Sequence, residues 1–258
     1  MKKKKTESVE VSVQEIKQKE VTFCLVGKSP LICNRMSQKV LQELLFPAKK
    51  KNAAERATTL KHDPLQEYRN SPYTTTDDTA PTRITMLATS FKGALRSAAL
   101  EIAGATKAQI GRLTYIEGDT VSIYGAPQML MATVRQAGMN RTPDVRTRAI
   151  LPRWAASVTI QFVSPQLSTE TISNLFAGAG VFIGVGDWRP EKGNGNYGQF
   201  ELVPGDDKRF AEIVKTGGIA EQDAALDSPE FYDKETADLY TWFSAEAKVR
   251  DRKIAAAS

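Results

Sequence analysis

The arginines between residues 135 and 153 are the side chains of this sequence best suited to bind a ligand. Five arginines lie within these nineteen residues, opposed by one acid, Asp144. Arginine presents a planar fork of donors that matches phosphate, so such a segment can hold a nucleic-acid backbone without reading its sequence. The alternative is a solvated basic loop that binds nothing. The five are Arg135, Arg141, Arg146, Arg148 and Arg153.

A second basic pair, Lys92 and Arg96, lies four residues apart in a segment with helical periodicity. Residues at this spacing share one face of a helix, and the N-terminal end of a helix attracts anions. The pair therefore predicts a further phosphate contact. The alternative is that Arg96 forms an ion pair with Glu43 or Glu101.

The glycine-rich loop, residues 184–198, has five glycines, whose missing side chains let its backbone approach a ligand or another backbone closely. Its Arg189, Lys192, Gly193 and Gly195 are candidate contacts to nucleic acid, and Trp188 is a candidate for stacking on a base. Asp187 and Glu191 in the same loop do not suit phosphate, and each has a nearby arginine as an alternative partner. An irregular surface loop is the simpler interpretation. The loop follows a helix and precedes a strand, the reverse of a dinucleotide-binding fingerprint, so no nucleotide cofactor is expected.

Catalysis has two weak candidates, and neither is assigned a catalytic role. His62 is the only histidine and the only candidate for a histidine general base; a surface or capping role is the alternative. Asp144 is the acid placed within the basic segment. Metal ligands are not clustered, because the pairs Asp77–Asp78 and Asp206–Asp207 direct neighbouring side chains apart. We therefore expect no metal and no cofactor.

The chain has 258 residues and a formal net charge of +5, with its charges unevenly distributed. Ten basic and four acidic residues lie between 83 and 153, whereas eight basic and twelve acidic residues follow 203. A basic middle beside an acidic tail indicates one face that meets an anionic polymer. No run of 18 apolar residues and no secretory signal is seen, and two lone cysteines indicate a reducing compartment. A cytoplasmic protein without a membrane partner is expected.

These residues must be positioned by an α+β core. The pattern predicts a charged arm at 1–19, a core at 20–203 with insertions at about 47–82 and 136–149, and a helical acidic tail at 204–258. Within the core, Ser90 is the expected N-cap of the first helix. The predicted elements are a strand at 21–27, a helix at 90–102, two strands within 121–135 joined by a turn at Gly125-Ala-Pro127, a long strand at 149–163, a helix at 168–180 and a strand at 197–203. This is the β-α-β-β-α-β order of a ferredoxin-like (RRM-like) fold, whose open sheet is a common platform for single strands.

In this order of elements the sequence resembles the RAMP superfamily, the ferredoxin-like subunits of CRISPR effector complexes, and particularly their backbone subunit. Three features carry the resemblance: the glycine-rich loop before the last strand, the segment Ser90-Phe-Lys92-Gly93-Ala-Leu-Arg96, and the basic excursion from Arg135 to Arg148, which looks like the thumb hairpin of that family. The chain is also similar in style to bacteriophage proteins of this size.

The resemblance implies a non-catalytic protein that binds single-stranded RNA or DNA without sequence preference. Copies of such a protein form a homo-oligomer along the strand, alongside other phage or CRISPR-like subunits in a bacterial cell. Two alternatives stay open. One is a RAMP-type endoribonuclease that uses His62 or Asp144, and the other is a phage structural or assembly protein.

Overall fold

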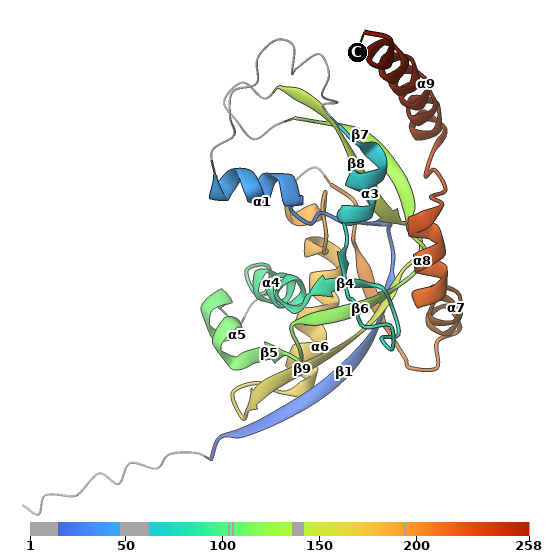
Figure 1. Ribbon diagram of the computed structural model, residues 1–258. Coiled ribbons are helices and arrows are strands. Elements are labelled where there is room, and N and C mark those ends of the chain that lie inside the picture. Colours follow the sequence, from blue (N-terminus) through green and yellow to red (C-terminus); the bar gives the residue numbers. More distant parts are fainter. Residues whose placement is uncertain are drawn as a thin grey trace, which may run out of the picture.

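The computed structural model describes residues 15–46, 62–102, 104, 106–135, 142–192 and 195–257, and shows an α+β protein. Its main antiparallel sheet has the order β10-β1-β9-β6-β4-β3, with β5 also paired to β9 (Figure 1). The strands are β1 (Lys17–Gly27), β3 (Tyr73–Thr74), β4 (Ile84–Leu87), β5 (Thr114–Ile116), β6 (Thr120–Tyr124), β9 (Ala155–Ser164) and β10 (Phe200–Val203).

The predicted ferredoxin-like order of elements is confirmed. Along the chain, β1 is followed by α4 (Ala88–Ala98), β5 and β6, β9, α6 (Thr169–Gly178) and β10. In the sheet these strands lie in the order β10, β1, β9 and then β5 and β6, which is the arrangement of this fold. β5 and β6 together occupy one strand position, because they pair with successive parts of β9.

The turn expected at residues 125–127, between a strand at 121–124 and one at 128–135, is confirmed. At this turn the φ of Gly125 is +132°, and a Cβ atom there would lie 2.3 Å from the carbonyl oxygen of Arg153. The long strand expected at 149–163 is wrong, because it is broken in two at residues 152–154. β7 (Gln128–Arg135) and β8 (Pro143–Leu151) pair with each other and with β2 (Leu31–Ile32) in a second sheet.

Other boundaries also differ from the expectations. β1 begins at Lys17, inside the expected arm; residues 1–14 lie outside the described part of the chain. Ser90 is not an N-cap, because α4 begins at Ala88 directly after β4, with Leu87 as the cap residue. In the first expected insertion, residues 47–61 lie outside the description. Residues 64–70 form α3 (Pro64–Asn70), whose Tyr68 is fully buried in the core.

Helices α4 and α6 and the π-helical turn η1 (Ala179–Ile183) cover one face of the main sheet. Their contact with the sheet is aromatic: Phe176 lies 5.6 Å from Phe23 and 5.3 Å from Phe200, measured between ring centroids. Ser168 caps α6 as expected, by accepting a hydrogen bond from the Thr171 N–H. These contacts bury the apolar side chains that alternate along the strands.

The opposite face of the main sheet is polar but carries no cation on its central strands. Thr22 lies 2.9 Å from Thr159, and Gln18 donates to Gln161 at 2.7 Å, across the β1–β9 pair. The remaining residues on this side of β1, β6 and β9 are uncharged apart from Glu20. A surface without Lys or Arg does not attract phosphate. The expected open-sheet platform for single strands therefore lacks the necessary charge.

The C-terminal segment is helical, as expected, and it is joined to the body. It forms α7 (Lys208–Thr216), α8 (Ile219–Asp227) and α9 (Lys234–Ala257). Phe231 forms a parallel bridge with Met129 of β7. Gln222 of α8 is fully buried: it accepts from the Ile84 N–H at 2.8 Å and donates to the carbonyl oxygen of Ile123 at 2.7 Å.

Gln222→Ala should destabilise the protein by about 2–4 kcal/mol, since it leaves a buried N–H and carbonyl groups without partners. Urea unfolding followed by circular dichroism measures the change. The neighbouring exposed Glu221→Ala is the matched control and should stay within about 0.5 kcal/mol of the wild type. A loss at Gln222 no larger than that of the control would contradict the anchoring role of α8.

Candidate nucleic-acid interface

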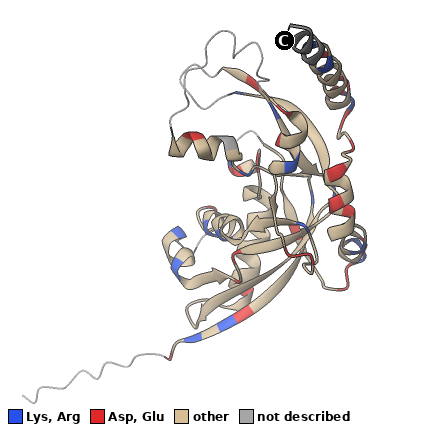
Figure 2. Cartoon of the chain, in the orientation of Figure 1, with Lys and Arg blue, Asp and Glu red and all other residues tan. Residues whose placement is uncertain are grey.

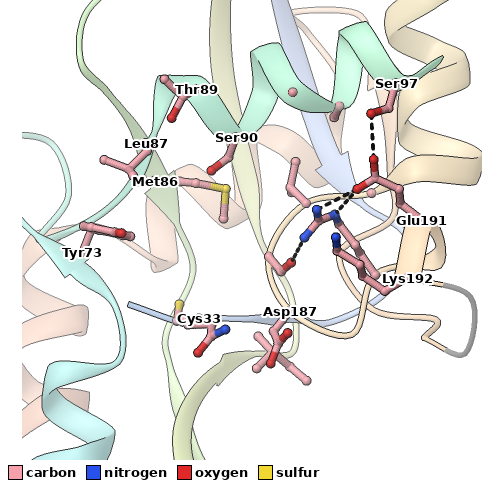
Figure 3. Close-up of a pocket in the computed structure, with 18 of the residues that line it drawn as sticks. Cys33, Tyr73, Met86, Leu87, Thr89, Ser90, Ser97, Asp187, Glu191 and Lys192 are labelled. Carbon is pink, nitrogen blue, oxygen red and sulfur yellow. Dashed lines mark hydrogen bonds and ion pairs between the residues drawn. The ribbon is translucent and has the colours of Figure 1, made fainter. Parts of the chain in front are cut away.

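A cavity of about 470 Å³ lies between α4, the glycine-rich loop and the segment that follows β2 (Figure 3). α4 contributes Thr89, Ser90 and Gly93 to its wall, and Asn34 and Tyr73 lie across from the helix. Its volume is within the range of pockets that hold small ligands or one unit of a polymer. Two of the three features that resemble the RAMP superfamily thus meet around one space.

The charged side chains of this cavity are mainly basic. Arg96, Lys107, Arg189 and Lys192 line it together with the acids Asp187 and Glu191. Within the described residues, Lys107 and Lys192 are exposed and have no ion pair. Arg96 lies against Gly111 of α5 (Lys107–Leu113), where a Cβ atom would be 2.7 Å from its Nε. That Nε is buried without a hydrogen-bond partner in the described part of the chain.

Both acids of the glycine-rich loop pair with neighbouring arginines, and this alternative from the sequence is confirmed. Asp187 accepts from Arg148 of β8. Glu191 accepts from Arg189 at 2.7 Å and from the Ser97 hydroxyl at 2.7 Å. Burial alone would raise the pKa of Glu191, but these hydrogen bonds outweigh it and hold the pKa below the usual glutamate value. The carboxylate is therefore ionised at neutral pH and neutralises Arg189.

Trp188 packs inside the molecule. Its backbone has a positive φ of 51°, which is uncommon outside glycine. Its ring lies 5.9 Å from that of Tyr197 and has the Arg148 guanidinium 5.6 Å from its centroid. The half-buried ring also packs against the second sheet beside Ile32. Stacking of Trp188 on a base remains a prediction, and it would require these contacts to open.

The backbone of the glycine-rich loop is folded closely on itself. A Cβ atom on Gly195 would lie 1.5 Å from the carbonyl oxygen of Trp188. One on Gly198, where φ is +69°, would lie 1.7 Å from the carbonyl oxygen of Val185. Gly193 lies outside the described residues. The close approach predicted for these glycines is thus to the loop's own backbone.

The remaining predicted contacts are dispersed. Arg135 is exposed at the end of β7, Arg146 pairs with Asp144 at 3.4 Å, and Arg153 pairs with Glu212 at 3.1 Å. Lys92 is half-buried and does not line the cavity. Arg141 lies outside the described residues. Residues 143–151, expected in part as a loop, are the strand β8, so the basic segment is spread along one side of a hairpin.

The sequence analysis missed Lys107, Asn34 and Tyr73 as cavity residues. Lys107 follows Thr106, which caps α5 through a capping box with Gln109. The capping box predicts where the helix begins, but it does not predict that this helix end lies beside the cavity. Asn34 and Tyr73 reach the cavity through the pairing of β2 with β8 and of β3 with β4. No local pattern in the sequence predicts these pairings.

The two catalytic candidates, His62 and Asp144, lie together although 82 residues separate them. His62 Nε2 is 3.0 Å from Asp144, and Nδ1 is 2.7 Å from Glu67 of α3. The Thr147 N–H of β8 also donates to Glu67. Both ring nitrogens are engaged, so neither is free to accept a proton from a substrate. The group joins α3 to β8.

Other chemistry finds little support in the described part of the chain. Burial raises the pKa of the Cys33 thiol, which lines the cavity, to about 12, so it is not a reactive thiolate. No group of three His, Cys, Asp or Glu side chains suited to a metal ion is found among the described residues. Nor does any helix described there have the length and apolarity to cross a bilayer.

Comparison with known proteins found no matching family model and no similar curated protein. Among solved structures, the chain is similar to one in the cryo-EM structure of the Type III-B Cmr-beta bound to cognate target RNA, with 15% identity and a TM-score of 0.36. The match covers 73% of this chain and 60% of the other chain. This likeness assigns no residue and no activity to the present protein.

Gly195→Val should destabilise the protein by about 3 kcal/mol or more, because the loop backbone must move away from the new side chain. Thermal unfolding measures the effect. Gly205→Val is the matched control: nothing lies within 4 Å of its added Cβ atom, and the change should cost about 0.5 kcal/mol or less. Equal stability of the two variants would show that the loop does not need its close backbone contacts.

Proposed function

We propose that the protein binds single-stranded nucleic acid without cutting it, and that the cavity between α4 and the glycine-rich loop holds the sugar–phosphate backbone. The observation that carries the proposal is that Arg96, Lys107 and Lys192 line one space and form no ion pair among the described residues. Thr89 and Ser90 add hydroxyl donors from the first turn of α4. These groups recognise phosphate and sugar, so binding is independent of base sequence.

A single strand fits this site better than a duplex does. The cavity is bounded by α4 on one side and by the glycine-rich loop on the other, so access from both sides is restricted. Tyr73, Met86 and Leu87 form an apolar wall opposite the cations. An unpaired base can pack on such a wall while its phosphate meets the cations.

Copies of the protein would line up along the strand through charge complementarity. α5 carries Lys107 and Arg112 without an acid, and α8 carries Glu221, Asp223 and Asp227 without a cation of its own. Arg83 pairs with Asp223 and Arg69 with Asp227, so Glu221 is the acid of α8 that forms no ion pair among the described residues. Figure 2 shows these helices on opposite sides of the body. A head-to-tail contact of this kind generates open assemblies when it does not close into a ring.

Endoribonuclease activity is the second candidate function, favoured by the contact between His62 and Asp144. Two observations oppose it. Glu67 and Asp144 engage both ring nitrogens, and neither His62 nor Asp144 lines the cavity that we propose for the nucleic acid.

Replacing Arg96, Lys107 and Lys192 together by Gln should weaken binding of single-stranded RNA or DNA equally across sequences. The slope of log K against log salt should fall by about 2, the value for three lost contacts to a single strand. Fluorescence anisotropy over a salt series measures both. The control replaces Lys208, Lys215 and Lys234, exposed lysines of the C-terminal helices, by Gln. If the control loses as much affinity, net charge rather than the cavity is responsible.

The wild-type protein should leave single-stranded RNA intact, and His62→Ala should keep the wild-type affinity for it. The physical reason is that His62 is engaged by two carboxylates away from the cavity. Labelled RNA incubated with excess protein and resolved on a denaturing gel checks the first outcome, and anisotropy checks the second. Cleavage by the wild type that disappears in His62→Ala would establish the endoribonuclease instead.

A further inference from the structure

α1 (Gln38–Leu45) is a short amphipathic helix whose apolar side is exposed. Leu41, Leu44 and Leu45 lie three and four residues apart, so they share one side of the helix. The helix ends at Phe46, whose backbone is extended. Leu44 is 72% exposed, Leu45 76% and Phe46 79%. Contiguous apolar patches on the surface of a soluble protein mark interaction sites. We call these four side chains the α1 surface.

The outer side of α9 carries a second exposed apolar surface. Its inner side faces the body, because Thr236 is fully buried and accepts from the Met131 N–H of β7 at 3.1 Å. Trp242 and Val249 are seven residues apart and lie on the side of the helix away from Thr236. Trp242 is 62% exposed and Val249 42%. These two side chains form the α9 surface, and tryptophan is enriched among the residues that dominate binding energy at interfaces.

The two surfaces lie on opposite sides of the molecule. Figure 1 shows α1 and α9 on either side of the β7–β8 hairpin, so they do not cover each other within one copy. The same figure shows α5 on the side of α1 and α8 on the side of α9. A head-to-tail step that brings α5 of one copy to α8 of the next therefore also brings the α1 surface toward the α9 surface.

We propose that α1 of one copy docks on the outer side of α9 of the next copy, with the Trp242 ring between the leucines of α1. The proposal rests on the head-to-tail assembly proposed above and supplies its apolar contact. The contact joins two different surfaces, so each copy keeps one surface of each kind for its two neighbours. Repetition of such a contact builds an open assembly unless the rotation closes it into a ring.

Charges at the borders of the two surfaces favour this pairing. Glu43 adjoins Leu44 on α1, and Lys248 adjoins Val249 on α9. Both charged side chains are exposed, and neither forms an ion pair within the described ranges of the chain. A carboxylate and an ammonium at the rim of an apolar contact fix its orientation and add little affinity.

A second copy bound through unlike surfaces accounts for both exposures. An α1–α1 contact leaves Trp242 exposed, and an α9–α9 contact leaves the leucines of α1 exposed. Residues 47–61, which follow α1 and lie outside the described part of the chain, would also leave Trp242 exposed if they covered α1. The α1–α9 contact covers both surfaces with residues that the structure describes.

Sedimentation velocity of the full chain without nucleic acid, over a range of protein concentrations, tests the proposal. One short helix forms a small contact, so association should be weak. The average mass should rise with concentration above 28.4 kDa and should not stop at two copies. Leu44→Glu and Trp242→Glu should each keep the monomer mass where the wild type associates, because each places a carboxylate in the apolar contact.

Ile16→Glu is the matched control for these two variants. Ile16 is also an exposed apolar residue, with 65% of its surface accessible. It directly precedes β1, and Figure 1 shows the start of β1 at the far end of the molecule from α1 and α9. The control should therefore associate as the wild type does. If it also remains monomeric, added negative charge rather than the α1–α9 contact is responsible, and the proposal is overturned.

A mixture of the two interface variants tests whether the surfaces are unlike. Leu44→Glu keeps an intact α9 surface, and Trp242→Glu keeps an intact α1 surface. An equimolar mixture should therefore form a dimer of one copy of each and grow no further. Association that is lost in Leu44→Glu but unchanged in Trp242→Glu indicates an α1–α1 contact and overturns the proposal. Association that neither variant changes overturns it as well.

A wild type that stays monomeric at every concentration also overturns the proposal. Loss of thermal stability in Leu44→Glu would then indicate that the chain's own residues 47–61 cover α1. These measurements use no nucleic acid, so their failure is distinct from a failure of the proposed single-strand binding. Leu44→Glu should bind an oligonucleotide long enough for one copy with the wild-type affinity, as measured by fluorescence anisotropy.

Discussion

The close contact of the glycine-rich loop with its own backbone is the constraint on which the rest of the site depends. No Cβ atom fits at Gly195 or Gly198, because carbonyl oxygens of the loop occupy that space. The contact fixes the backbone at Trp188, and Asp187 and Glu191 lie close to it in the same loop. Asp187 is thereby directed to Arg148 on the second sheet, and Glu191 to Ser97 on α4. One loop thus joins the hairpin, the main sheet and the helix that bounds the cavity.

The same loop determines which cations are available to a ligand. Its acids neutralise Arg148 and Arg189. Arg96, Lys107 and Lys192 are left without acidic partners among the described residues. The proposed site therefore has fewer available cations than the basic composition of the chain suggests. Its affinity for an anionic ligand should be correspondingly weaker and should depend on salt. The open face of the sheet carries no Lys or Arg on its central strands, so we propose the interface at α4 instead.

The second sheet determines how the side chains of the basic segment are arranged. β7 and β8 form a hairpin whose residues alternate between two faces. Arg146 and Arg148 are two residues apart and share one face of β8, but each forms its own ion pair, with Asp144 and Asp187 respectively. α3 packs against β8 through His62 and Glu67, so the two residues that looked catalytic hold elements together. Arg146 and Arg148 lie in one stretch of the sequence, but in the folded protein they pair with different acids.

The sequence by itself determined the β-α-β-β-α-β order, the cap of α6 at Ser168 and the need for glycine in the loop, because these depend on local periodicity and on backbone conformation. It also indicated arginine partners for Asp187 and Glu191. Only the tertiary structure decided that the strand expected at 149–163 breaks at 152–154, that Lys107 and Tyr73 reach the cavity, and that His62 meets Asp144. Each of these depends on contacts between residues far apart in sequence, where pairing between strands and burial outweigh local preference.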